Sequence, residues 1–176
     1  MRKLAYIFGI ALFFFGCAGV PSLSDRREEL VRKNPNNANA HYNLGASFSK
    51  IGRHLEAIAS YKEAIRIKPD YANAHYGLGF YYNQLPQYEE AMASNKEVIR
   101  INPDYFDAHL NLGVAYNGLG QHQNAIASYK EAIRIKPDNA KGHNNLGWAY
   151  KNMGRNEEAI AEYKEALRID PNFTVA

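Results

Sequence analysis

The sequence predicts an all-α solenoid built from four copies of a two-helix repeat, and three observations support this. Prolines recur at positions 35, 69, 103, 137 and 171, a period of 34 residues. Between them one pattern recurs, opening "AHYNLGASF", "AHYGLGFYY", "AHLNLGVAY" and "GHNNLGWAY" and closing with "KEAIRIKP" or a close variant. Within each copy, apolar and small residues recur at helical spacing. A fixed period of this length is typical of proteins whose structural units stack on one another.

The N-terminus is typical of a signal peptide rather than a membrane-spanning helix. Arg2 and Lys3 precede an apolar run from Leu4 to Phe15, which is too short to cross a bilayer, because a span needs about 20 apolar residues. Residues 14–17, Phe-Phe-Gly-Cys, resemble the lipobox of bacterial lipoproteins, with phenylalanine in place of the usual leucine. In that family the cysteine is joined to diacylglycerol and the peptide is cut just before it.

Cys17 is the only cysteine in the chain. We therefore expect residues 1–16 to be a lipoprotein-type signal peptide and Cys17 to carry the lipid that tethers the mature chain to a membrane. The alternatives are a plain signal peptide with an incidental cysteine and an uncleaved N-terminal anchor. Ala18, rather than aspartate, follows Cys17. By resemblance to Gram-negative lipoproteins, this indicates a location in the cell envelope, on the outer membrane and facing the periplasm.

The charge balance gives no reason to expect a nucleic-acid partner. The chain has 21 Lys and Arg against 18 Asp and Glu, and the expected signal peptide contains two of the basic residues, so 19 remain against 18. With one cysteine, no disulfide forms within one chain, so the fold must depend on packing.

The two ends of the repeat array differ. After a linker at 17–24, "SDRREELVRKNP" aligns with the second half of a repeat. Asp25 and Glu28 have the spacing of a capping box, so we expect residues 25–34 to form a helix that covers the first repeat. The tail, 172–176, has no such helix. The last helix, expected from Glu157 to Ile169, either has its apolar flank covered by Phe173 or leaves it open for self-association or a partner. We expect the covered form.

Each repeat is expected to contain two helices that pack through small and large residues and are separated by a glycine turn. The pattern in the first repeat consists of His41, Leu44, Gly45, Phe48, Gly52, Ala57, Tyr61, Ala64 and Pro69. It resembles the tetratricopeptide repeat (TPR), and the resemblance covers about residues 36–171. It implies repeats at 35–69, 70–103, 104–137 and 138–171, stacked in a right-handed superhelical arc whose first helices line a concave groove.

The second repeat departs from this pattern. Pro86 replaces the turn glycine, and we expect its φ to be negative, as the proline ring requires. Asn95 replaces the tyrosine of the other repeats, and Val98 replaces an alanine. A buried amide is costly unless it is paired. We therefore expect either a soft joint at this repeat or a shape specialised by Phe80, Tyr81 and Tyr82, and we predict a higher melting temperature for Asn95→Tyr.

The TPR resemblance also places candidate binding residues on the first helices. Asn43, Asn111 and Asn145 each precede the leucine of Leu-Gly, where the second repeat has Gly77. This ladder resembles the repeats of the enzyme that attaches N-acetylglucosamine to proteins, in which asparagines hold the backbone of an extended peptide. An amide suits this role because it both donates and accepts hydrogen bonds. The other candidates are Tyr42, Tyr76, Phe80 and Trp148, with Lys50, Asn83, Asn117 and Lys151.

An alternative for these residues is that the asparagines bond only between neighbouring helices and the aromatic residues belong to the core. Another repeated set, His41, His75, His109 and His143, is expected to be structural. Equivalent positions in neighbouring repeats lie at least about 8–10 Å apart, whereas zinc ligands lie about 2 Å from the metal.

No phosphate-binding loop and no nucleophile with a base at recognisable spacing is present. We therefore expect no catalytic residue, metal or cofactor. The expected function is that of a membrane-tethered scaffold that binds a protein or peptide in its groove, in envelope assembly or secretion. The alternatives are a glycan-binding or cell-wall accessory protein, whose aromatic residues stack on sugars, and a noncatalytic subunit of an enzyme.

Overall fold

The computed structural model describes residues 22–174, and in this range the chain forms nine α-helices and no strand. A single helix, α1 (Leu23–Lys33), precedes four helix pairs. The pairs are α2 (Ala38–Lys50) with α3 (His54–Ile67), α4 (Ala72–Gln84) with α5 (Tyr88–Ile101), α6 (Phe106–Gly118) with α7 (His122–Ile135), and α8 (Ala140–Asn152) with α9 (Asn156–Ile169). The predicted all-α repeat fold is confirmed.

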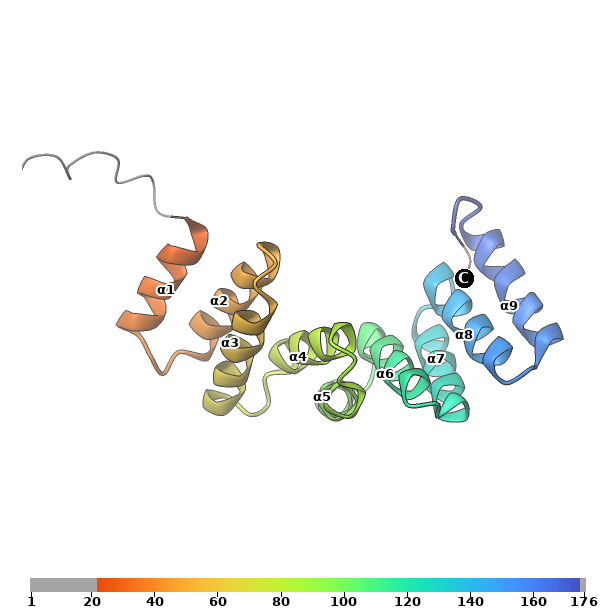
Figure 1. Ribbon diagram of the computed structural model, residues 1–176, viewed down its shortest axis with the longest axis horizontal. Helices are drawn as coiled ribbons and strands as arrows, with labels where there is room; N and C mark the ends of the chain where they lie inside the picture. The colour runs from red at the N-terminus through yellow and green to blue at the C-terminus, as the bar shows by residue number, and fades with distance from the viewer. Residues whose placement is uncertain (1–21, 175–176) are drawn as a thin grey trace, which may run out of the picture.

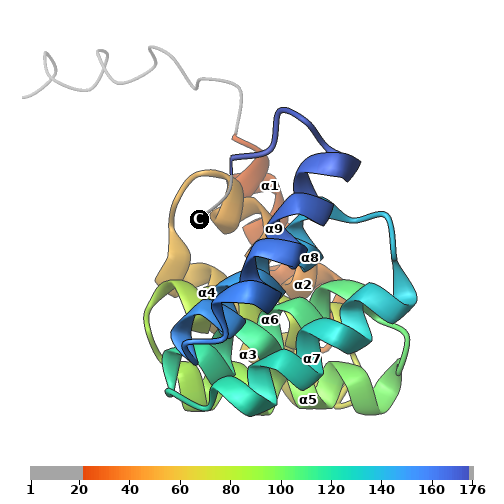
Figure 2. The same ribbon diagram turned by 90° about the vertical axis from the view of Figure 1, so that its right-hand side faces the viewer.

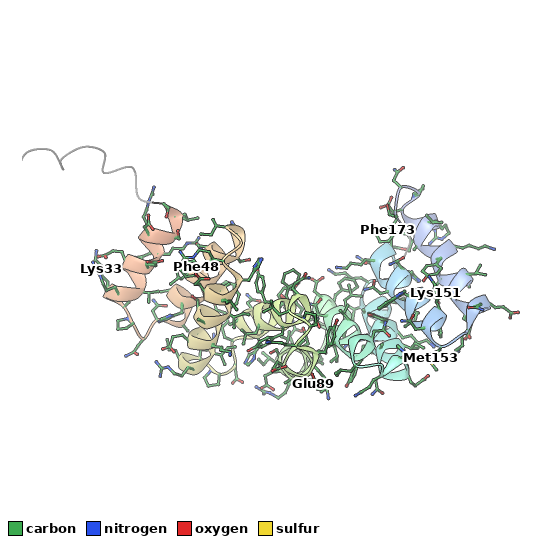
Figure 3. All side chains as sticks on the ribbon, viewed as in Figure 1. Lys33, Phe48, Glu89, Lys151, Met153 and Phe173 are labelled. Atoms are coloured by element: carbon green, nitrogen blue, oxygen red, sulfur yellow. The ribbon has the colours of Figure 1, made fainter. Side chains whose placement is uncertain are left out.

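The helix pairs stack into an arc with α1 at one end and α9 at the other (Figure 1). At the middle of the arc, α4 and α6 form its inner side and α5 lies beneath them, on the outer side. In the perpendicular view, the second helices α3, α5 and α7 lie together on this outer side (Figure 2). Figure 3 accordingly shows Glu89, at the start of α5, on the outside of the arc. The first helices therefore line the inner side, as the sequence predicted.

The turn within each pair needs a residue with positive φ. Gly52, Gly120 and Gly154 have φ values of 71 to 76° there, which glycine adopts without strain. Pro86, at the same position in the second repeat, also has a positive φ, 28°, so the expectation of a negative value is wrong. The turn is closed by the same hydrogen bond as in the other repeats, here from the Gln87 N–H to the Tyr82 carbonyl at 2.9 Å. The stacked helices thus impose the common turn on a strained proline.

Helix α1 begins earlier than predicted and has a different cap. Ser22 and Asp25 form the capping box, with the Asp25 N–H donating to Ser22 Oγ at 3.1 Å and the Ser22 N–H to Asp25 Oδ2 at 2.9 Å. The predicted pair of Asp25 and Glu28 is therefore wrong. Arg27 occupies the position of the core tyrosine of the later repeats, and its guanidinium donates to the Asn43 carbonyl and to Ser47 Oγ. Helix α1 thus covers α2 partly through polar contacts.

Tyrosine packed on glycine joins the two helices of a repeat. A Cβ atom on Gly45 would lie 2.8 Å from the ring of Tyr61, and one on Gly147 would lie 2.8 Å from the ring of Tyr163. The glycine of Leu-Gly is therefore needed because the ring of the second helix rests on the backbone of the first. Among the described residues, the buried apolar side chains form two clusters. One extends over α2 to α5 and reaches Ala115, and the other extends over α6 to α9.

The second repeat lacks this tyrosine. Asn95 is fully buried against Gly79, and its Nδ2 donates to the Ala91 carbonyl at 2.8 Å, while its Oδ1 has no hydrogen-bond partner. Because an amide is smaller than a phenol ring, α4 and α6 approach each other more closely than the other neighbouring first helices do. Asn83 Nδ2 then reaches the Asn111 carbonyl, at 2.9 Å.

Within residues 22–174, none of the helices has both the length and the apolar character that a bilayer span requires. The predicted signal peptide and the predicted lipid attachment site, Cys17, lie outside the described residues.

Candidate functional site

The predicted asparagine ladder is distributed along the arc. Asn43 on α2 is exposed, whereas Asn111 on α6 and Asn145 on α8 are half-buried. At the missing rung, a Cβ on Gly77 would lie 2.8 Å from the Tyr61 ring. An asparagine there would require the Tyr61 ring to shift. The ladder presents its amides at three points of the inner side rather than as one cluster.

Polar groups concentrate at the middle of the arc, around α4 and α6. The rings of Tyr76 and Tyr105 lie 5.3 Å apart, and the Asn111 side chain lies beside the Tyr76 hydroxyl. Burial raises the pKa of Tyr76 to about 12, so the hydroxyl stays protonated and able to donate at neutral pH. Asn83 Oδ1 and Asn111 Nδ2 have no protein partner. For Asn83, the bond between neighbouring helices that the alternative predicted is present.

Asn117 and Tyr42 are positioned as parts of the packing. Asn117 is buried, and its Oδ1 accepts a hydrogen bond from His122 Nδ1 at 2.8 Å. The Tyr129 hydroxyl lies near this side chain but has no hydrogen-bond partner, and burial raises the pKa of Tyr129. Tyr42 is half-buried, with its ring 5.7 Å from that of Tyr61. A ligand on the inner side would reach little of either Asn117 or Tyr42.

Four predicted residues are exposed on the first helices besides Asn43. Phe80 lies on α4 and Trp148 on α8, and both rings are accessible. Lys50 and Lys151 lie in the last turns of α2 and α8, where a positive charge is favourable beside the helix C-terminus. Because these residues lie in the first, second and fourth repeats, only an elongated ligand would contact all of them.

The histidine ladder is structural, as predicted. In each repeat, the ring Nε2 donates to the carbonyl of the proline six residues earlier, at 2.9 Å for His41, 2.8 Å for His75 and His109, and 3.0 Å for His143. These bonds fix the turn that precedes each first helix. His143 also contacts Glu162, with 2.7 Å between Nδ1 and Oε2. The described part of the chain contains no group of three or more residues that could hold a metal ion.

Family models match most of the chain. A model described as TPR repeat matches residues 48–85, 81–120 and 115–154, and models described as tetratricopeptide repeat match residues 28–59 and 140–173. The chain belongs to the tetratricopeptide-repeat family. Proteins of this family are typically non-catalytic, and the fold of this TPR protein supports a role as a scaffold for protein–protein interaction.

No curated protein sequence matches this TPR protein, but solved structures resemble it. A crystal structure of MamA is 26% identical over 87% of this chain and 97% of its own, with a TM-score of 0.79. A second crystal structure, of MamA protein, is 27% identical over 87% of this chain and 86% of its own, with a TM-score of 0.79. MamA 41-end from Desulfovibrio magneticus RS-1, at 21% identity, has a TM-score of 0.80 over 84% of both chains and shows the fold alone.

Two hollows lie outside the predicted groove of this TPR protein. One, of about 390 Å³, lies between α3 and α5 over α4, and the other, of about 250 Å³, lies one repeat later. Both have an apolar floor and are lined by a lysine and one or two glutamates at equivalent positions. No predicted groove residue lines either hollow. Both hollows arise from the way the repeats pack on the outer side of the arc.

The end of the TPR array differs from the prediction. Ile160 is 53% exposed and Leu167 is 38% exposed. The expectation that Phe173 covers the flank of α9 is therefore wrong. Figure 3 shows Phe173 at the opposite end of α9 from Met153. At the other end of the array, Leu23 and Leu30 are also exposed, which the sequence analysis did not anticipate. Comparing these positions with their equivalents one repeat away would have revealed both features.

Proposed function

We propose that this TPR protein is a membrane-tethered scaffold that binds an extended peptide or partner segment along the inner side of its arc. The observation that supports this most is the combination of accessible rings, Phe80 and Trp148, with amides of Asn43, Asn111 and Asn145 on the same row of first helices. Rings supply apolar contact, and amides pair with the peptide groups of any sequence. The TPR fold independently favours a protein partner.

The proposal includes a location. Lipid attached to Cys17 would tether the array in the bacterial cell envelope, at the outer membrane facing the periplasm, and its role there would be in envelope assembly or secretion. Stable anchoring needs more than one acyl chain, which the lipobox resemblance supplies. Replacing Cys17 by serine should abolish metabolic labelling with radioactive palmitate, and unchanged labelling would refute the lipid anchor without affecting the groove.

Capture of the partner tests the groove. The tagged protein is cross-linked in its host, and the enriched proteins are compared between the native chain and the triple variant Asn43→Ala, Asn111→Ala, Asn145→Ala. A matched control carries three alanines on exposed outer positions, Glu89, Glu90 and Gln123. We expect one partner that is lost in the first variant and kept in the second. A partner kept equally in both would place the binding surface elsewhere.

A second candidate function is the binding of glycans or cell-wall fragments. The exposed Phe80 and Trp148 rings favour it, because a flat accessible ring suits a sugar face. The chain has one tryptophan, so Trp148 fluorescence reports the event directly. Saturable quenching by cell-wall fragments, absent in Phe80→Ala, would support this candidate, whereas a flat titration would rule it out for this ring.

A further inference from the structure

The outer flank of α9 carries an apolar pair that interior repeats bury. Ile160 and Leu167, two turns apart, are exposed. Their equivalents one repeat earlier, Ile126 and Ile133, are buried and half-buried respectively, in contact with the second core cluster. In the interior of the array, this flank packs against the first helix of the next repeat, as α7 packs against α8. Within residues 22–174, no helix packs against it in α9.

The opposite end of the array carries a matching pair. Leu23 and Leu30 on α1 are 51% and 53% exposed, and they too are two turns apart. They occupy the positions of Ala57 and Ala64 in the first repeat, which are fully buried between α3 and α2. Helix α1 thus exposes the face that a preceding first helix covers elsewhere. Each end of the array lacks a neighbour on its outward side.

The two apolar pairs lie at opposite ends of the arc, because α1 and α9 are its outermost helices (Figure 1). One molecule cannot bring them together without closing the arc, whereas a second copy can supply the missing end. We infer that this TPR protein associates head to tail, with the α9 pair Ile160 and Leu167 of one copy packed on the α1 pair Leu23 and Leu30 of the next. This contact is heterologous, so it generates open chains rather than a closed dimer.

The charges beside the pairs agree with this contact. If the two helices pack antiparallel with their apolar pairs aligned, Lys33 lies opposite Glu157 but Arg26 lies opposite Lys164. If they pack parallel, Lys33 lies opposite Asp170 and Arg26 lies opposite Tyr163. The parallel arrangement is therefore the favoured one, because Arg27, which faces Lys164 in it, directs its guanidinium to α2. A contact between two single helices is smaller than a standard stable interface, so the association is weak and depends on concentration.

Sedimentation velocity tests the inference. All described helices lie within residues 22–174, so the chain from residue 22 onward is used, at about 10 μM to about 1 mM, the range in which weak complexes dissociate. We expect species that grow beyond dimers as concentration rises. Leu30→Glu and Ile160→Glu should each give monomers throughout. The matched control is Leu55→Glu, since Leu55 is 71% exposed and lies on neither end helix. Circular dichroism verifies that every variant is folded.

Mixing the two disrupted variants distinguishes this contact from symmetric ones. The Leu30→Glu variant keeps an intact α9 pair, and the Ile160→Glu variant keeps an intact α1 pair. A head-to-tail contact therefore gives heterodimers that grow no further. If only Ile160→Glu disrupts association, the contact is α9 with α9, and if only Leu30→Glu does, it is α1 with α1; either result overturns the inference. A native chain that stays monomeric at every concentration also overturns it. None of these outcomes affects the proposal that the inner side of the arc binds a partner.

Discussion

Restoring the missing tyrosine of the second repeat is the sharpest test of how this array is built. In the first repeat the Tyr61 hydroxyl interacts with Ser49 on the preceding helix, whereas in the third repeat the Tyr129 hydroxyl lies near Asn117 without a hydrogen-bond partner. The equivalent residue in the second repeat is Asn83, whose Oδ1 has no partner. Asn95→Tyr should therefore place a hydroxyl beside an acceptor that already lacks a donor.

The expected gain follows from opposing terms. Burying the ring contributes about 1.5–3 kcal/mol, and removing the unpartnered Asn95 Oδ1 contributes about 1–3 kcal/mol. Against this, α4 and α6 must separate, which costs the bond from Asn83 to the Asn111 carbonyl, about 1 kcal/mol. Val98, fully buried one turn away where the other repeats have alanine, adds overpacking of about 1–3 kcal/mol. We expect a net gain of about 1 kcal/mol for Asn95→Tyr and about 2 kcal/mol for Asn95→Tyr with Val98→Ala.

Thermal unfolding followed by circular dichroism measures this. For a chain of this size, 1 kcal/mol shifts Tm by about 2–4 °C, so the single variant should gain a few degrees and the double variant about twice as much. Val98→Ala alone should lower Tm, because it leaves a cavity beside Asn95. The reasoning is refuted if the double variant melts below the native chain, since Asn95 would then be better satisfied than its unpartnered oxygen indicates.

Three further outcomes are expected. Pro86→Gly should raise Tm by a few degrees, because relief of strain worth about 1–3 kcal/mol exceeds the entropy that glycine adds to the unfolded chain, about 0.5–1 kcal/mol; a lower Tm would mean that the proline is not strained. The free energy of unfolding should stay level up to about pH 10 and fall between pH 10 and 12. Burial raises the pKa of Tyr61 and Tyr76 to about 12. In that pH range the unfolded state has therefore released these protons while the folded state still holds them. Replacing both Tyr61 and Tyr76 by phenylalanine should reduce this loss of stability above pH 10. An unchanged loss would contradict its assignment to these two tyrosines. His109→Leu should lower the free energy of unfolding by about 1 kcal/mol in urea denaturation, through loss of the bond to its proline carbonyl, whereas an equal effect at the more exposed His41 would show that burial does not strengthen this bond.

The sequence predicted most of the fold because the same pattern of apolar, small and turn residues occurs in all four repeats. The period placed the helix pairs and the turns, and the geometry of neighbouring repeats indicated that the histidines were structural. Pro86 was mispredicted because local preference was weighed without the stacking that enforces the common turn. The cap of α1 was missed because several polar residues near Ser22 fit the capping pattern and only the chain direction selects one.

The candidate site was less predictable, since burial on a first helix depends on the next repeat as well as on the residue. Asn117 and Lys151 share one repeat offset, yet Asn117 is buried beside Tyr129 while Lys151 is exposed in the last repeat. Similarly, Tyr42 and Trp148 were assigned to one surface, but Tyr42 is half-buried against the first core cluster whereas Trp148 is exposed. A single repeat pattern does not encode these differences, because they arise from neighbours that change along the array.

The division of the buried side chains into two clusters has a consequence for hydrogen exchange. Each repeat in a linear array contacts only its neighbours, so cooperativity passes along the chain from unit to unit, and the buried apolar contacts are least continuous between the two clusters. The backbone amides of α2 and α3 and those of α7 and α8 would then report two separate opening free energies. Half of the arc can unfold and refold while the other half stays native, so a segment bound along both halves is released in stages.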